Sequence, residues 1–178
     1  MIHIQPGFAY QTEMDHVKIN LTGAISYLGL RNIANQANSD LLNSKDAIDT
    51  STNNADGTVR YQHDVVYPTL AMEYCWGGDK KDTYGLKLFG DYIYNPDPED
   101  TGFLLGAKLG YRKVGKKFGD WQVGYNFRYL EDDAFIDAFS DSDAYSGETN
   151  VKGSELSLEI GLAQNVILGF DYYYMEPI

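Results

Sequence analysis

The sequence of 178 residues has few cysteines, few prolines and no long apolar run. Cys75 is its one cysteine, so no disulfide can form within the chain, and we expect Cys75 to be a small residue of a strand. A membrane-spanning helix needs about 18 uninterrupted apolar residues, which no segment approaches, and the mean hydropathy of −0.39 excludes a helical membrane bundle. A membrane-spanning strand is not excluded, because it needs only about 9–11 residues with alternate ones apolar.

Basic residues and catalytic motifs are also scarce. Fourteen Lys and Arg stand against 26 Asp and Glu, for a net charge of −12, whereas binding to nucleic acid requires clustered basic residues. The motifs GxSxG, GxxxxGK(S/T), HExxH and paired CxxC do not occur, and the three histidines have no metal-ligand spacing. We therefore predict no nucleic-acid partner, no enzymatic activity and no cofactor.

The sequence is rich in segments in which apolar and polar residues alternate. In the stretch WQVGYNFRYL, residues 121–130, every odd position is apolar or aromatic, while four of the even positions are Gln, Gly, Asn and Arg. This period of two indicates a β-strand with two different faces. Eight strands are predicted in this way, at residues 2–11, 16–29, 66–77, 83–95, 102–114, 121–130, 152–163 and 166–176. One short helix at 39–48 is the only competing pattern.

The connections between these strands alternate in length. TEMDH, GGDKKD, GKKFG and AQN read as short turns, and the segments 30–58, 95–101 and 131–151 read as longer loops. A two-sheet sandwich has no reason to sort its connections in this way. The pattern predicts an all-β, antiparallel up-and-down transmembrane β-barrel in a single domain spanning residues 1–178, with short turns at one rim and long loops at the other.

The apolar face of the predicted strands suits a lipid-facing band. Rows of five apolar residues span about 25 Å once the strands are tilted. Aromatic residues gather near the ends of these rows, where they are expected to form girdles at the two membrane interfaces. The girdle candidates are Tyr27, Trp76, Tyr84, Tyr92, Tyr94, Tyr111, Trp121, Tyr129, Tyr172 and Tyr174.

The opposite face mixes small polar residues with charges of both signs. Buried charges without water or partners would cost several kcal/mol each, so this composition favours a water-filled lumen. Charged side chains that line such a lumen set its selectivity, unless they only pair across strands and fill it. The candidates are Glu73, Lys87, Asp91, Lys108, Arg112, Arg128, Glu159 and Asp171.

Two loops have possible roles of their own. Segment 30–58 is too long for an ordinary connection, so it is expected to lie outside the barrel or to constrict its lumen. The loop DAFSDSDAYSGE, residues 137–148, offers hard oxygen ligands for calcium but lacks the full twelve-residue loop signature, so a solvated acidic loop is the preferred interpretation and no metal site is predicted. The four oxygen ligands concerned are Asp137, Asp141, Asp143 and Glu148.

Residues 121–164 also resemble the "putative porin" family of Gram-negative outer membranes. The matching features are a GDW-type strand start, a strand end of the YRYLE type, a loop with DAFxDSD and a following TNxKGxEL strand. The matching residues are Trp121, Arg128, Tyr129, Glu131, Asp137, Ala138, Phe139, Asp141, Ser142, Asp143, Asn150, Lys152 and Gly153. The resemblance implies an outer-membrane channel for passive diffusion of small polar solutes, in contact with the lipid bilayer and able to form homo-oligomers.

Both ends of the sequence differ from that pattern. The first twenty residues lack the basic start and apolar core of a signal peptide, and the last residues, YYYMEPI, do not complete a strand with a terminal aromatic. Since porins of this family are longer, we expect this chain to be the C-terminal part, or a reduced form, of a larger barrel.

Two other functions stay open at this point. The first is a small closed outer-membrane barrel that acts as an anchor or adhesin through its loops. The second is a soluble lipocalin-like binding barrel whose apolar face points inward.

Overall fold

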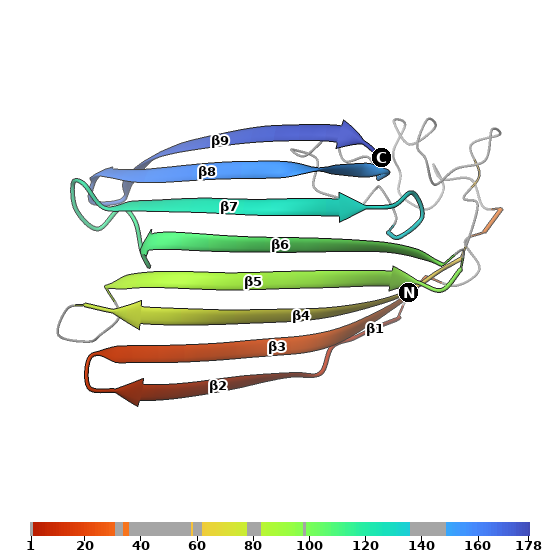
Figure 1. The fold of residues 1–178 in the computed structure, drawn as a ribbon, viewed down its shortest axis with the longest axis horizontal. Coiled ribbons are helices and arrows are strands. Elements are labelled where there is room, and N and C mark those ends of the chain that lie inside the picture. Colours follow the sequence, from red (N-terminus) through yellow and green to blue (C-terminus); the bar gives the residue numbers. More distant parts are fainter. Residues whose placement is uncertain are drawn as a thin grey trace.

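The computed structural model describes residues 2–30, 34–35, 58, 62–77, 83–97, 99–135 and 149–178. Across these ranges the chain forms nine antiparallel strands in a single sheet (Figure 1), and no helix in them is long and apolar enough to cross a membrane. The strands are β1 (Ile2–Ile4), β2 (Gly7–Met14), β3 (Val17–Leu30), β4 (His63–Trp76), β5 (Tyr84–Asn95), β6 (Asp100–Tyr111), β7 (Trp121–Leu130), β8 (Val151–Ala163) and β9 (Val166–Pro177).

The sheet follows the order of the chain. From β3 to β9 each strand pairs with the next one in sequence, and β1 and β2 both pair with β3. The break between β1 and β2 falls at Pro6, which has no N–H to donate to a ladder. Its carbonyl still accepts a hydrogen bond from the N–H of Ile25 at 3.0 Å, so the two short strands continue one line along β3.

These pairings confirm the predicted all-β, antiparallel up-and-down fold, with one predicted strand divided in two. The sheet is barrel-like but not closed, because β1 and β2 lie at one edge and β9 at the other.

Cross-strand register separates the two faces of the sheet. Residues that are directly opposite in an antiparallel pair point to the same face. One such row crosses the sheet from β2 to β9 and is apolar throughout: Tyr10, Leu21, Met72, Leu88, Ala107, Tyr125, Leu156 and Tyr172. The adjacent row, on the other face, contains only polar residues and glycine: Gln11, Asn20, Glu73, Lys87, Lys108, Gly124, Ser157 and Asp171.

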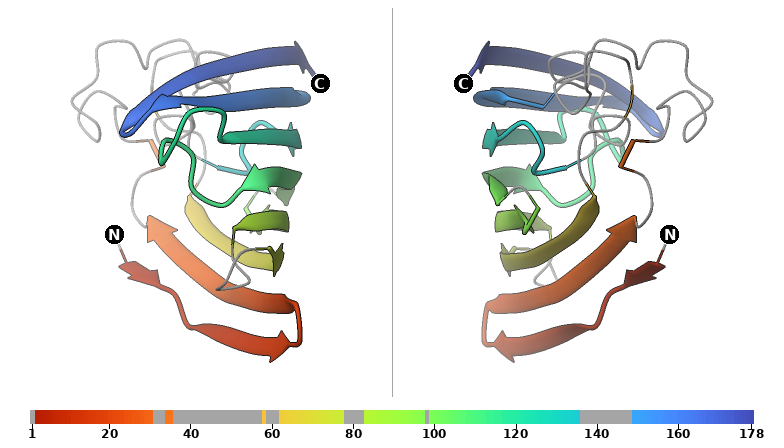
Figure 2. Two further views of the ribbon diagram at one scale, coloured as in Figure 1. Left: turned by 90° about the vertical axis from the view of Figure 1, so that its left-hand side faces the viewer. Right: turned by 90° about the vertical axis from the view of Figure 1, so that its right-hand side faces the viewer.

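The sheet is strongly curved, and the polar face is the concave one. Figure 2 shows the segment between β6 and β7, residues 112–120, inside the hollow of the curve. This segment is hydrogen-bonded near the turn of the last hairpin, between β8 and β9. The bonds run from Gly119 N–H to the Gly161 carbonyl at 2.9 Å and from Asn165 N–H to the Gly115 carbonyl at 2.8 Å. By register parity Gly161 shares its face with Glu159 and Ser157, which belong to the polar rows.

The apolar rows therefore cover the convex surface. Large side chains there are open to the surroundings: Leu70 is 55% exposed, Leu105 58% and Phe170 60%. Within the described part of the chain, the buried apolar residues are few and mostly small, among them Val65, Cys75, Ala134 and Val151. A soluble barrel would place its apolar rows inside and its polar rows outside.

The predicted alternation of short and long connections is wrong in two places. The connection from β5 to β6 is only residues 96–99, because Asn95 pairs with Asp100 across it. The connection from β6 to β7 is residues 112–120 and is longer than the turn that GKKFG suggested. The predicted helix at 39–48 lies outside the described residues, as do nearly all of loop 30–58 and residues 136–148 of loop 131–151.

Candidate functional site

The eight predicted lumen residues lie on the concave face. Register places seven of them there, and Arg112, which follows the last residue of β6, reaches the same face through its contact with Glu73. Four of the eight, Glu73, Lys87, Lys108 and Arg112, line one pocket of about 240 Å³ together with Gly85 and Gln122.

The other four predicted lumen residues lie farther along the wall. Asp91 and Lys87 line a second hollow with residues of β3 and β4. Arg128, Glu159 and Asp171 stand opposite Gly153, Gln122 and Ser157, respectively. The structure therefore brings together one cluster around β4, β5 and β6 and leaves the other four charges outside it.

Glu73 and Arg112 form a two-pronged ion pair at the centre of that cluster. Arg112 donates from Nε to Glu73 Oε1 and from Nη2 to Oε2, each at 2.8 Å, and Asn20 Nδ2 donates to the same Oε2 at 3.0 Å. The planar guanidinium matches a carboxylate in this way, whereas a lysine could offer only a point charge. Both oxygens of Glu73 are thus engaged, and its negative charge is balanced locally.

Lys87 and Lys108 are direct cross-strand neighbours on β5 and β6, and both are exposed to the hollow. Like charges that face each other across a ladder repel, so this pair destabilises the sheet unless water or an anion lies between the ammonium groups. The Lys87 ammonium also lies 5.5 Å from the centre of the Phe89 ring, where the face of the ring attracts a cation.

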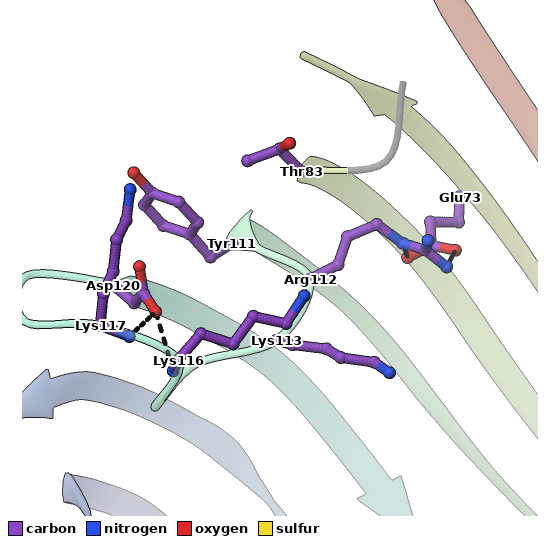
Figure 3. A pocket seen from close by; sticks show the side chains of 8 residues that line it. All are labelled: Glu73, Thr83, Tyr111, Arg112, Lys113, Lys116, Lys117 and Asp120. Atoms are coloured by element: carbon purple, nitrogen blue, oxygen red, sulfur yellow. Dashed lines mark hydrogen bonds and ion pairs between the residues drawn. The ribbon is translucent and has the colours of Figure 1, made fainter. Parts of the chain in front are cut away.

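The segment between β6 and β7 adds residues that the sequence pattern did not single out. It lines a pocket of about 390 Å³ at the rim of the concave wall, shown in Figure 3. The lining residues are Glu73, Thr83, Tyr111, Arg112, Lys113, Lys116, Lys117 and Asp120. Four cations and two carboxylates leave this pocket with a net charge of plus two, in a chain whose net charge is −12.

Asp120 holds this segment in shape. Its side chain is buried, and Oδ2 accepts hydrogen bonds from the N–H groups of Lys116 at 3.0 Å and Lys117 at 2.9 Å. Gly115 and Gly119 flank these donors with φ values of 84° and 85°, a conformation that glycine adopts without strain. The sequence GKKFGD was the available signal for this turn. Glycines and an aspartate at this spacing favour a tight turn in which the aspartate side chain accepts hydrogen bonds from nearby backbone N–H groups.

The ten girdle candidates all lie on the convex face by register, and Tyr111, the last residue of β6, also lines the rim pocket. At the short-turn end, Trp76 stacks on Tyr84 and the Tyr111 ring contacts Tyr84 at a tilt. The Tyr84 hydroxyl donates to the Tyr111 hydroxyl at 2.9 Å. At the other end, the Tyr129 ring stacks on Phe103 with centres 5.6 Å apart. Tyr172 differs from the others, because it shares the central row of Leu88 rather than a row at either end.

The long-loop end of the sheet is rich in carboxylates that accept hydrogen bonds. Glu131 accepts from Thr101 N–H at 2.7 Å, from the Thr101 hydroxyl at 3.0 Å and from the Tyr129 hydroxyl at 3.0 Å. Burial alone would raise the pKa of Glu131, but these donors outweigh the burial and lower the pKa below its usual value. Asp100 similarly accepts from Asp133 N–H at 2.7 Å.

No metal site emerges from the described part of the chain. Within those ranges, no three His, Cys, Asp or Glu side chains are arranged to hold a metal ion. The calcium candidates Asp137, Asp141, Asp143 and Glu148 lie outside the described residues.

An up-and-down sheet with an apolar convex face and a charged concave face places the chain in the class of β-barrel-like proteins. The family comparison narrows this class: residues 61–178 match the protein family described as "Putative porin". The chain belongs to this family. Neither the comparison with curated proteins nor the comparison with solved structures gave a match.

Proposed function

We propose that this protein acts as a channel of a bacterial outer membrane, through which small polar solutes diffuse passively. The observation that carries the proposal is the pair of adjacent rows that contain Leu88 and Lys87, since each keeps one character from β2 to β9. A sheet of this kind suits two solvents at once, with hydrocarbon against one face and water against the other.

The strand lengths fit the same interpretation. The strands β3 to β6 contain 12–14 residues each, long enough to cross a hydrocarbon layer when tilted. On the concave side, charged and small polar groups would offer solutes weak contacts at many points, so that a solute enters without being trapped. Transport by this mechanism needs no cofactor and no chemical step.

A pore also requires a closed cylinder. The described strands leave β2 and β9 as the outer edges of the sheet, so closure in a bilayer must join these edges to each other or to further strands. The two cases differ in their interior. Eight strands enclose a space just wide enough for side chains, as in the anchor or adhesin alternative, whereas a wider barrel holds water.

The full chain, folded in detergent and inserted into planar bilayers, is expected to give discrete conductance steps. A folded protein that carries no current would reject the channel and favour the anchor or adhesin. A protein that folds without detergent and binds an apolar ligand would favour the lipocalin-like alternative.

A matched pair of cysteine variants tests the orientation of the two faces in the same experiment. Lys108→Cys is expected to react with a charged, water-soluble thiol reagent and to lose current, while Leu88→Cys is expected to be protected by lipid. Cys75 is buried, so it gives little background. Equal reaction at both positions, or reaction at Leu88→Cys alone, would contradict the proposed orientation.

A further inference from the structure

We propose that the segment between β6 and β7 forms a binding site for small oxyanions, such as phosphate or a carboxylate, on the concave wall. Its ligands are Lys113, Lys116 and Lys117, with Arg112 at the inner side of the same pocket. The existence of the binding site does not depend on the proposed function. Its role in making the channel prefer anions rests on the proposed function.

The segment is fixed in place, as a binding site requires. Asp120 ties the N–H groups of Lys116 and Lys117 together, and backbone hydrogen bonds from Gly119 and to Gly115 fasten the segment to the last hairpin. The lysine side chains therefore start from a preformed backbone, and binding a ligand does not have to order this segment first.

Most of the negative charge of the pocket is already engaged, while the three lysines form no ion pair with a described residue. Glu73 is held by Arg112 and Asn20. Asp120 accepts two backbone N–H groups at Oδ2, and its Oδ1 is buried without a hydrogen-bond partner among the described residues. Lys113, Lys116 and Lys117 are all exposed, and none of them makes an ion pair with another described residue. The three lysine side chains give this pocket positive charge that is not neutralised by such an ion pair, and this charge would attract an anion.

Tyr111 adds a donor at the outer side of the pocket. Its hydroxyl accepts a hydrogen bond from Tyr84, so its own hydrogen is available to a ligand. Its ring lies 5.3 Å from the Lys117 ammonium, which places that cation at the edge of the pocket in Figure 3. Ammonium and hydroxyl donors suit oxyanions, because these ligands offer several acceptor oxygens.

The positive charge continues from the rim along the wall. The rim pocket and the pocket that contains Lys87 and Lys108 have Glu73 and Arg112 in common. An anion that leaves the rim would therefore meet the second lysine pair next. A volume of about 390 Å³ at the rim suits a small molecule rather than a protein or a nucleic acid.

The direct test is titration of inorganic phosphate into the full chain folded in detergent, followed by calorimetry at low ionic strength. Phosphate is expected to bind, and Lys116→Gln with Lys117→Gln is expected to weaken the binding at least about tenfold, because two charged donors are lost. The matched control is Lys18→Gln with Lys152→Gln, which removes two charges elsewhere and should leave affinity within about twofold. Lys116 and Lys117 are exposed, whereas Lys18 and Lys152 are half-buried and Lys152 is paired with Glu176. Circular dichroism of both variants therefore checks that each is folded before the titration.

The outcomes separate this site from the channel function. Absence of phosphate binding to the wild type, or equal binding to the wild type and the Lys116/Lys117 variant, would overturn the site even if conductance steps are seen. Phosphate binding without conductance would keep the site and reject the channel.

In a conducting protein, the reversal potential under a KCl gradient tests selectivity. A preference for chloride that falls in the Lys116/Lys117 variant supports the role in selectivity, and a preference for potassium in the wild type overturns it.

Discussion

Lys87 and Leu88 are neighbours in the chain, yet the rows to which they belong have opposite characters. The row of Leu88 presents aliphatic and aromatic side chains to the convex side on every strand from β2 to β9. The row of Lys87 presents charges, amides, a serine and a glycine to the concave side. Both rows cross the same antiparallel ladders. The difference therefore reflects the medium that each face meets, not the way in which the strands are joined.

The contrast also shows where the free energy of folding arises. Little of the apolar surface in the described part of the chain is buried against protein, so burial within a core contributes less here than in a soluble domain of similar size. The convex rows are stabilising only if hydrocarbon covers them. The predictions below test this dependence, beginning with the largest expected effect.

Leu88→Arg is expected to be the most damaging of these changes. Leu88 is 44% exposed on the convex face, and a cation placed near the middle of a bilayer on the lipid face of a barrel costs about 2–4 kcal/mol. The free energy of unfolding in lipid vesicles, followed through the fluorescence of the two tryptophans, should fall by this amount.

Lys87→Leu is the matched control for that substitution. It changes the adjacent residue on the concave face and removes the repulsion between Lys87 and Lys108, so it should alter stability by less than about 1 kcal/mol. If Lys87→Leu lowers the free energy of unfolding strongly and Leu88→Arg does not change it, then the two faces have been assigned the wrong way round.

Two ion pairs at different places in the sheet give a second comparison, of intermediate size. Glu73 and Arg112 contact at 2.8 Å with side chains 23% and 28% exposed, whereas Lys152 and Glu176 are 3.5 Å apart with side chains 41% and 51% exposed. Double-mutant cycles to alanine should give a coupling free energy of about 1–3 kcal/mol for the first pair. The second pair should give less than about 1 kcal/mol, because solvent screens it and two long side chains must be ordered.

Equal coupling free energies in the two cycles would contradict the expectation that the shorter, less exposed pair of Glu73 and Arg112 is the stronger one. Repeating both cycles at high salt is a further test. Salt should reduce the coupling free energy of Lys152 and Glu176 more than that of Glu73 and Arg112.

The sequence was sufficient to predict the faces of the strands, because alternation is a local property. Leu88 and Lys87 could be assigned to opposite faces from their neighbours alone, and register then confirmed that each joins a row of its own kind. The break in the first strand was harder to predict. Pro6 disrupts the ladder without changing the alternation on either side of it, so one strand was expected where the structure has two.

Connections could not be predicted in the same way, since their shapes depend on distant contacts. Segment 96–99 is short because Asn95 pairs with Asp100 and also donates to the Asp133 carbonyl at 2.7 Å, which the two nearby prolines do not reveal. Segment 112–120 lies on the concave side because Gly119 and Gly115 bond to the last hairpin, more than forty residues later in the chain. The lysines of the proposed anion site were missed for that reason.

The smallest expected effect concerns acid at the long-loop end. The pKa of Glu131 in the folded protein lies below its ordinary value of 4.5, so the Glu131 carboxylate stabilises the fold fully above that pH. This contribution is lost as the pH falls from 4.5 through the lower pKa of the folded state. Glu131→Gln should therefore reduce the free energy of unfolding near neutral pH, by less than about 1 kcal/mol because the group is partly solvated.

Measuring that free energy as a function of pH provides the decisive readout, because the wild type and Glu131→Gln should converge as the pH falls below 4.5. Glu99→Gln is the control, since it removes an exposed charge from the same end without touching Thr101. A constant difference between wild type and Glu131→Gln at every pH would show that Glu131 acts through packing. Convergence would instead show that the Glu131 carboxylate stabilises the long-loop end by accepting hydrogen bonds. The lysines of segment 112–120, at the short-turn end, form no ion pair with a described residue and are left to bind a ligand.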